Sequence, residues 1–111
     1  MSAARVKICG LVRAADVDAA VAAGADALGF VFTERSPRCV TTTEAAELVA
    51  RVPAFVARVG LFMDADADVV RQVLEAVPLS LLQFHGRESG TFCRQFGRPY
   101  VKALGMGGGP V

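Results

Sequence analysis

The stretch Ala27-Leu28-Gly29-Phe30-Val31-Phe32 is the apolar run that first indicates how this chain folds. Its length and its aromatic and β-branched residues are typical of a strand. Segments with helical spacing of apolar residues lie on either side of it, near residues 15–23 and 43–52. A strand that alternates with helices in this way predicts βα units and a parallel sheet.

The same alternation continues along the chain, so we expect five strands and four helices. The strands are expected at Arg5–Cys9, Ala27–Phe32, Ala57–Phe62, Ser80–Phe84 and Tyr100–Leu104. The helices are expected at Ala15–Ala23, Thr43–Val52, Ala67–Val77 and Ser89–Phe96. Local signals agree, because Thr41 and Glu44 have the spacing of a capping box before the second helix, and Pro53 follows its end.

The repeat length is compatible with a barrel. The strands recur about every 24 residues, and eight such units would make about 200 residues, the lower end for a (β/α)8 barrel. We therefore expect an α/β fold over residues 1–104: a partial (β/α)8 TIM barrel of four βα units plus a fifth strand, interrupted before closure. An open five-stranded sheet of flavodoxin type is the alternative, because the same pattern permits it.

The last residues, 105–111, are rich in glycine, and we expect them to form a flexible end. They do not form a phosphate-binding motif, because they fail the G-x-G-x-x-G pattern at its last position and no helix follows.

Composition excludes several classes of partner. Twelve basic and eleven acidic residues are scattered along the chain and give a net charge of +1, so no basic stripe indicates nucleic acid. The apolar runs are far shorter than the roughly 20 residues of a membrane span, and no targeting run precedes Arg5. A cytoplasmic location is expected. Three widely spaced cysteines and one histidine give neither a disulfide framework nor a metal motif.

Five short motifs, in register, carry a family resemblance. They are Lys7-Ile8-Cys9-Gly10-Leu11, Ala25-Asp26-Ala27-Leu28-Gly29-Phe30-Val31-Phe32, Ser36-Pro37-Arg38-Cys39-Val40, Val59-Gly60-Leu61-Phe62 and Leu82-Gln83-Phe84-His85-Gly86. In this order and at these intervals they closely resemble the phosphoribosylanthranilate isomerase family. Pro99-Tyr100-Val101-Lys102-Ala103 resembles the family's fifth strand, so the resemblance extends nearly to Leu104.

The resemblance implies an enzyme of tryptophan biosynthesis that works without a cofactor or metal. Its substrate would be a small phosphosugar, N-(5-phosphoribosyl)anthranilate, rearranged by an acid and a base to an open-chain ketone. In the family the acid is an aspartate later in the barrel, and phosphate is held by the loops after the seventh and eighth strands. We therefore expect the isolated chain to be inactive. The alternatives are a catalytically inactive half-barrel that self-associates through its open edges, and a flavodoxin-like binding module.

Cys9 is the candidate catalytic residue. By position alone, a cysteine at the end of a strand is more often a small packing residue. In a barrel, however, this position lies at the C-terminal face, where active sites are found. The resemblance implies that Cys9 is the general base.

Arg38, His85 and Gln83 are the candidate substrate-binding residues. A guanidinium can hold a carboxylate such as that of anthranilate with two parallel hydrogen bonds, although most loop arginines are only solvated charges. A lone histidine at a strand end is usually structural, but the resemblance places His85 and its motif at the pocket. Asp64 is interpreted as a cap of the third helix rather than an acid, and Cys39 and Cys93 as packing residues.

Overall fold

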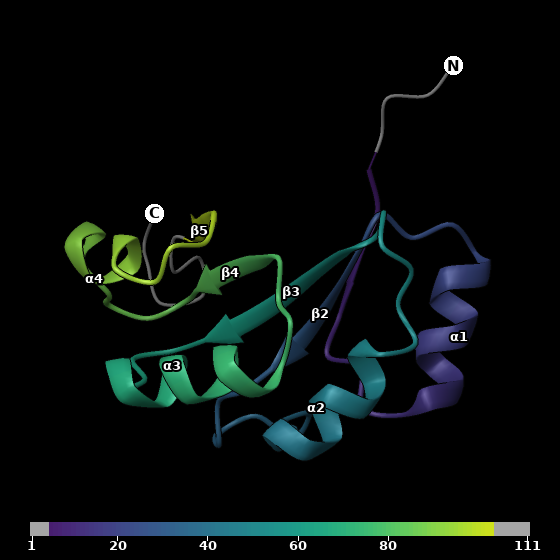
Figure 1. Cartoon of the computed structure of the whole chain (residues 1–111), viewed down its shortest axis with the longest axis horizontal. Coiled ribbons are helices and arrows are strands. Elements are labelled where there is room, and N and C mark those ends of the chain that lie inside the picture. Colours follow the sequence, from purple (N-terminus) through teal and green to yellow (C-terminus); the bar gives the residue numbers. More distant parts are fainter. Residues whose placement is uncertain (1–4, 104–111) are drawn as a thin grey trace.

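The computed structural model describes residues 5–103, in which strands and helices alternate (Figure 1). The strands are β1 (Lys7–Cys9), β2 (Ala27–Val31), β3 (Ala57–Phe62), β4 (Leu81–Phe84) and β5 (Tyr100–Lys102). The helices are α1 (Ala14–Ala22), α2 (Thr42–Val49), α3 (Ala67–Ala76) and α4 (Gly90–Arg94). All the expected elements are therefore present, with shifts of a few residues at their ends.

The order of the strands decides between the two expected architectures. All neighbouring strands are parallel, and the order in the sheet is β1-β2-β3-β4-β5, the same as the order in the chain. Figure 1 shows the four helices as an arc around one side of the curved sheet. A flavodoxin-type sheet has the order 2-1-3-4-5 and helices on both faces, so that alternative is wrong. The chain forms a partial (β/α)8 barrel.

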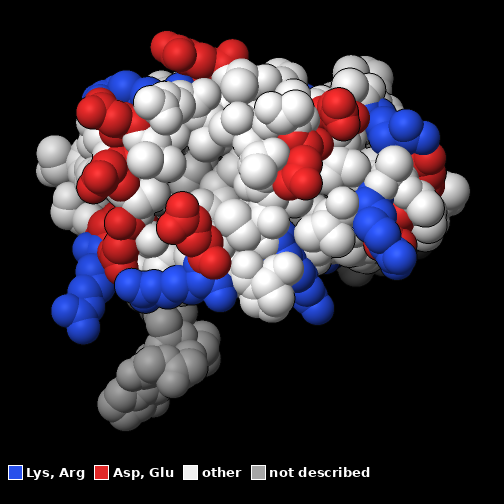
Figure 2. Space-filling view, turned by 90° about the horizontal axis from the view of Figure 1, so that it is seen from below, with Lys and Arg blue, Asp and Glu red and all other residues white. Residues whose placement is uncertain are grey.

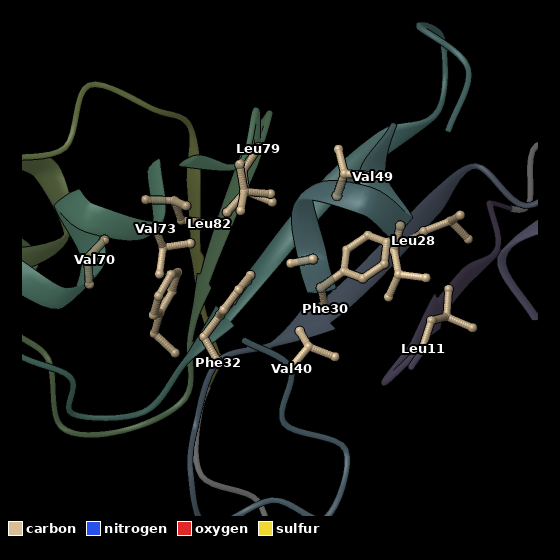
Figure 3. Packing of buried hydrophobic residues seen from close by; sticks show 14 of the residues in the cluster. Leu11, Leu28, Phe30, Phe32, Val40, Val49, Val70, Val73, Leu79 and Leu82 are labelled. Carbon is tan, nitrogen blue, oxygen red and sulfur yellow. The ribbon is translucent and has the colours of Figure 1, made fainter. Parts of the chain in front are cut away.

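The hydrophobic core lies between the sheet and the helices. Phe30, Phe62 and Phe84 point to this outer face and are almost completely buried. Figure 3 shows Phe30 of β2 near Val49 of α2, and Val73 of α3 beside Leu82 of β4. Burial of each large side chain contributes about 1.5 to 3 kcal/mol, so this layer is the main source of stability.

The opposite face of the sheet has smaller residues and none of the aromatic side chains of the outer face. One row across the strands consists of Cys9, Gly29, Val59 and Leu81, and the next consists of Val31, Leu61, Gln83 and Val101. In a barrel these alternate positions point to the axis. On this face Cys9 and Val101 are exposed, whereas Val59 in the middle of the sheet is buried. Within residues 5–103 the inner face is therefore open at Cys9 and Val101, on the first and last strands.

Helix α2 ends earlier than predicted. The capping box of α2 is confirmed, because Thr41 Oγ1 accepts from Glu44 N at 3.1 Å and Glu44 Oε1 accepts from Thr41 N at 2.9 Å. The helix nevertheless ends at Val49, three residues before the expected Val52, because Arg51 N and Val52 N donate to carbonyls three residues back in a tighter turn.

Helix α4 is also shorter than expected. Ser89, predicted as its first residue, is its N-cap and accepts from Phe92 N at 3.0 Å. The glycine-rich segment 105–111 and its predicted flexibility lie outside the described residues.

Candidate functional site

Cys9 ends β1, with its thiol directed over the neighbouring strand. A Cβ placed on Gly29 would lie 2.9 Å from Cys9 Sγ and 3.0 Å from Leu61 Cδ1. The missing side chain at position 29 therefore provides the space that the thiol occupies. Cys9 is exposed, so its Sγ is accessible from the inner side of the sheet.

The Arg38 side chain lies against Gly10, the residue that follows Cys9. Gly10 has a φ of 78°, a conformation that favours glycine, and its N donates to Gly29 O at 3.0 Å. A Cβ on Gly10 would lie 2.5 Å from Arg38 Cδ and 3.1 Å from an Arg38 guanidinium nitrogen. The Arg38 side chain thus packs on the Gly10 backbone. The structure therefore places Arg38 against the residue next to Cys9 in the chain.

The Arg38 turn is held against β2. Arg38 N donates to Ser36 Oγ at 3.0 Å, and Val40 N donates to Val31 O at 2.9 Å. Because these bonds return the loop to the end of its own strand, they keep a long exposed guanidinium over the C-terminal edge of the sheet.

His85 lies in a neighbouring cavity of about 310 Å³. The apolar lining comes from Val31, Leu61, Phe62 and Met63, and the polar lining from Thr33, Arg35, Ser36 and His85. Apolar walls with a few polar groups are typical of small-molecule sites. His85 N donates to Phe62 O at 2.8 Å, which fixes its backbone to β3. Neither Cys9 nor Arg38 lines this cavity, whereas Arg35, which the sequence analysis missed, does. Its only signal is its place directly before the Ser36-Pro37-Arg38 motif.

Gln83 occupies the inner face but is already engaged. Its Oε1 accepts from Lys7 Nζ. This hydrogen bond joins β4 to β1, which are not neighbours in the sheet. Lys7 opens the first of the family motifs, but the sequence alone indicated no role for it. Substrate binding by Gln83 stays a prediction.

The interpretation of Asp64 as a helix cap is wrong. The N-cap of α3 is Asp66, which makes no side-chain cap bond. Asp64 has a φ of 54°, and this left-handed turn directs its carboxylate to the loop after β4, where Asp64 Oδ1 accepts from Arg87 N at 2.6 Å. Asp64 therefore links the loop after β3 to the loop after β4.

The other two cysteines are unsuited to act as bases. Cys93 is buried in the core, and this burial raises the pKa of its thiol. Cys39 is half-buried, and burial first, then the charges of Glu34 and Glu44, raise its pKa. Both thiols are therefore largely protonated at neutral pH.

The charges on the helix side show no single-sign patch. In Figure 2, which views the molecule from the side of α2 and α3, acidic and basic side chains are interspersed. Within residues 5–103 no three His, Cys, Asp or Glu side chains are grouped as metal ligands. None of the helices in this described range is long and apolar enough to cross a membrane.

The strands are parallel and in sequential order, and the helices lie on the outside only, which defines part of a (β/α)8 barrel. In enzymes of this class the active site lies at the C-terminal ends of the strands. The family model described as N-(5'phosphoribosyl)anthranilate (PRA) isomerase matches residues 6–107. The chain belongs to this family.

Relatives that carry the name N-(5'-phosphoribosyl)anthranilate isomerase agree. The protein of Dechloromonas aromatica is 60% identical over 99 residues, which cover 89% of this chain and 48% of that protein. That of Thiobacillus denitrificans is 58% identical over 102 residues, covering 92% and 50%. The chain spans about half the length of the curated relatives it matches.

Solved structures of the family show the same fold. The Thermus thermophilus isomerase matches with a TM-score of 0.86 and 37% identity, over 91% of this chain and 52% of that one. An isomerase in complex with reduced 1-(o-carboxyphenylamino)-1-deoxyribulose 5-phosphate matches with a TM-score of 0.84 and 36% identity, over 88% and 52%.

Proposed function

We propose that this chain provides the base-bearing part of a phosphoribosylanthranilate isomerase, with Cys9 as the general base. The observation that carries the proposal is the position of Cys9, an exposed residue at the C-terminal end of β1 whose thiol lies over Gly29 and whose neighbour Gly10 contacts Arg38. Of the three cysteines in the chain, the other two are withdrawn into or against the core. A thiol must be reached by substrate to accept a proton, and Cys9 meets this requirement.

The proposed reaction is an Amadori rearrangement. A general acid protonates the ribose ring oxygen, the C1–O bond breaks, and the anthranilate nitrogen lone pair forms an iminium with C1. The Cys9 thiolate then removes the C2 proton, and the C–H electron pair forms the C1=C2 bond of an enolamine. Tautomerisation gives the ketone at C2. The positive iminium favours the thiolate while both are held close together.

Substrate recognition is assigned to two adjacent parts of the same edge. The guanidinium of Arg38 would bind the anthranilate carboxylate, since its two parallel donors match two carboxylate oxygens. The cavity of about 310 Å³ beside it, which His85 lines, would receive the ring against its apolar walls. The related isomerase bound to a reduced carboxyphenylamino compound supports a ligand of this class.

Phosphate binding and acid catalysis need residues from other strands. In (β/α)8 barrels the phosphate is commonly held by the loops after strands seven and eight, which lie beyond the five strands described here. The proposed activity therefore requires that these strands be supplied.

A chimera tests this proposal. Residues 1–103 of this chain would be followed by the segment of the Dechloromonas aromatica relative that the chain does not match. We expect isomerase turnover within the usual enzymatic range of about 1 to 10³ per second, measured by loss of phosphoribosylanthranilate fluorescence. An inactive but cooperatively folded chimera would contradict the proposal, whereas the relative's C-terminal segment alone is the control for background.

A second candidate is an inactive half-barrel that self-associates with another copy of this chain. It is favoured by the edges of β1 and β5, beside which no further strand lies within residues 5–103, and by Val101, which is 48% exposed on the inner face. Light scattering after size exclusion should then show dimers or larger species. Val101→Lys should weaken association, whereas Val69→Lys on α3, at a similarly exposed valine, should not. A sharp monomer peak would refute this candidate.

We also place the protein in the cytoplasm. All three of its cysteines are free, as expected in a reducing compartment.

A further inference from the structure

The loops after β3 and β4 are joined by one buried carboxylate, that of Glu88. Its side chain is only 2% exposed. Glu88 Oε1 accepts from Gly86 N at 2.8 Å, within its own loop, and Oε2 accepts from Asp64 N at 2.7 Å, in the other loop. Both oxygens are thus committed to backbone amides, one on each side.

Lys102 at the end of β5 completes the arrangement. Its Nζ forms an ion pair of 3.1 Å with Glu88 Oε1 and also donates to Gly86 O. A buried carboxylate is costly unless it is paired and fully hydrogen-bonded, and both conditions are met here. The ends of three successive strands, β3, β4 and β5, are therefore tied to a single side chain.

Asp64 makes the connection reciprocal. Asp64 N donates to Glu88, while Asp64 Oδ1 accepts from Arg87 N. Gly86 permits this approach, because a Cβ there would lie 2.4 Å from Asp64 Oδ1. The left-handed backbone of Asp64 is unfavourable for a residue other than glycine and persists only where surrounding contacts determine it. The Glu88 carboxylate is one of those contacts.

Glu88 binds the backbone amides of Asp64 and Gly86. The residues directly before these two are Met63 and His85, and both line the 310 Å³ cavity. We propose that Glu88 is a positioning residue, which holds the two loops so that Met63 and His85 form one wall of this cavity. The proposal rests on the proposed function in taking the cavity as the anthranilate subsite. Glu88 lies outside the motifs that carry the family resemblance, two residues after Gly86, the last residue of the motif that contains His85.

Hydrogen exchange in the full 111-residue chain tests the geometric part, with Glu88→Ala, Glu88→Gln and the control Glu75→Gln, an exposed glutamate on α3. In Glu88→Ala, peptides containing Asp64 and Gly86 should exchange about tenfold faster, while β2 and α2 peptides stay unchanged, because a hydrogen bond to a charged group is worth at least about that factor.

Glu88→Gln keeps the shape of the side chain but presents one acceptor oxygen instead of two. It should therefore accelerate exchange in one of the two loops more than in the other, and it serves as the readout if the alanine variant does not fold. Unchanged exchange in both loops, or equal acceleration throughout the chain, would overturn the proposal.

His85 gives a second readout because it is the only histidine in the chain. Its imidazole NMR signals should shift in Glu88→Gln and not in Glu75→Gln; unshifted signals would contradict a positioning role. In the active chimera, Glu88→Gln should raise KM about tenfold with a smaller change in kcat. If the unmutated chimera is inactive, the proposed function is refuted but the role of Glu88 is not. Hydrogen exchange and the His85 NMR signals still decide that role.

Discussion

The two faces of the sheet differ in what they contribute. On the outer face, Phe30, Phe62 and Phe84 are sealed under the helices in a continuous apolar layer. On the inner face, Cys9 is open and Val101 is 48% exposed. The outer layer is formed by segments close in sequence and supplies stability, whereas the inner face and its C-terminal edge carry the groups suited to chemistry. Substitutions on the two faces should therefore separate folding from function.

The largest expected effect is on stability. Phe84 is fully buried and contacts Phe62, Phe92, Phe96 and Tyr100. Phe84→Ala should lower the free energy of unfolding by about 3 to 5 kcal/mol, through lost burial and the cavity left behind. Val101→Ala on the inner face should cost less than about 1 kcal/mol. Urea unfolding of both variants measures the difference, and equal losses would refute the division between the faces.

Arg38→Ala should affect the reaction and leave stability nearly unchanged. Removing a charge-assisted contact with the substrate costs about 1.5 to 3 kcal/mol, which corresponds to roughly a tenfold to hundredfold fall in kcat/KM of the chimera. Arg13→Ala is the matched control, because Arg13 is an exposed arginine of the α1 N-cap, paired only with Asp16. If both variants retain full kcat/KM, Arg38 has no role in binding.

Alanine substitutions at Gly29 on the inner face and at Gly60 on the outer face allow a direct comparison of the two faces. A Cβ at Gly29 would press on Cys9 Sγ, whereas a Cβ at Gly60 would lie 2.4 Å from Leu79 Cδ1 in the outer core. Each alanine variant should lose about 1 to 3 kcal/mol by overpacking. Gly29→Ala should also change the rate at which iodoacetamide alkylates Cys9, and Gly60→Ala should not. If Cys9 is alkylated at the same rate in Gly29→Ala and Gly60→Ala, Gly29 does not determine the surroundings of the thiol.

The smallest effects concern the thiols themselves. At pH 8, iodoacetamide should label Cys9 first, Cys39 more slowly and Cys93 last, as located by peptide mass spectrometry. Burial raises the pKa of Cys39 and of Cys93, so the reactive thiolate of each appears only at higher pH. Labelling of Cys39 should therefore continue to increase above the ordinary thiol pKa of about 8.5. Labelling of Cys93 before Cys9 in the folded chain would contradict the assignment of the faces.

The elements were predictable because their signals are local. Apolar spacing indicated each helix and strand, and the capping box formed by Thr41 and Glu44 was read directly from residues three apart. The choice between a barrel and an open sheet was not predictable from the pattern, because it depends on which strands become neighbours. Only the observed order of β1 to β5 decides it.

The site was predictable in part, and for a different reason. Cys9, Arg38 and His85 were selected through the family resemblance, since each residue alone has a more ordinary structural interpretation. The contact of Arg38 with Gly10 and the link from Lys7 to Gln83 join distant parts of the sequence. Asp64 was misassigned because a helix cap and a carboxylate that fastens a loop look alike in sequence.

The most direct test of the central claim is Cys9→Ala in the active chimera, with Cys39→Ala as the matched thiol control. General-base catalysis supplies about 10²- to 10⁴-fold, so kcat should fall by at least that range for Cys9→Ala and stay near the parent value for Cys39→Ala. Unfolding midpoints of the Cys9 variant and the parent should agree closely, because Cys9 is exposed. A Cys9→Ala chimera that turns over substrate at the parent kcat would contradict the assignment of Cys9 as the base.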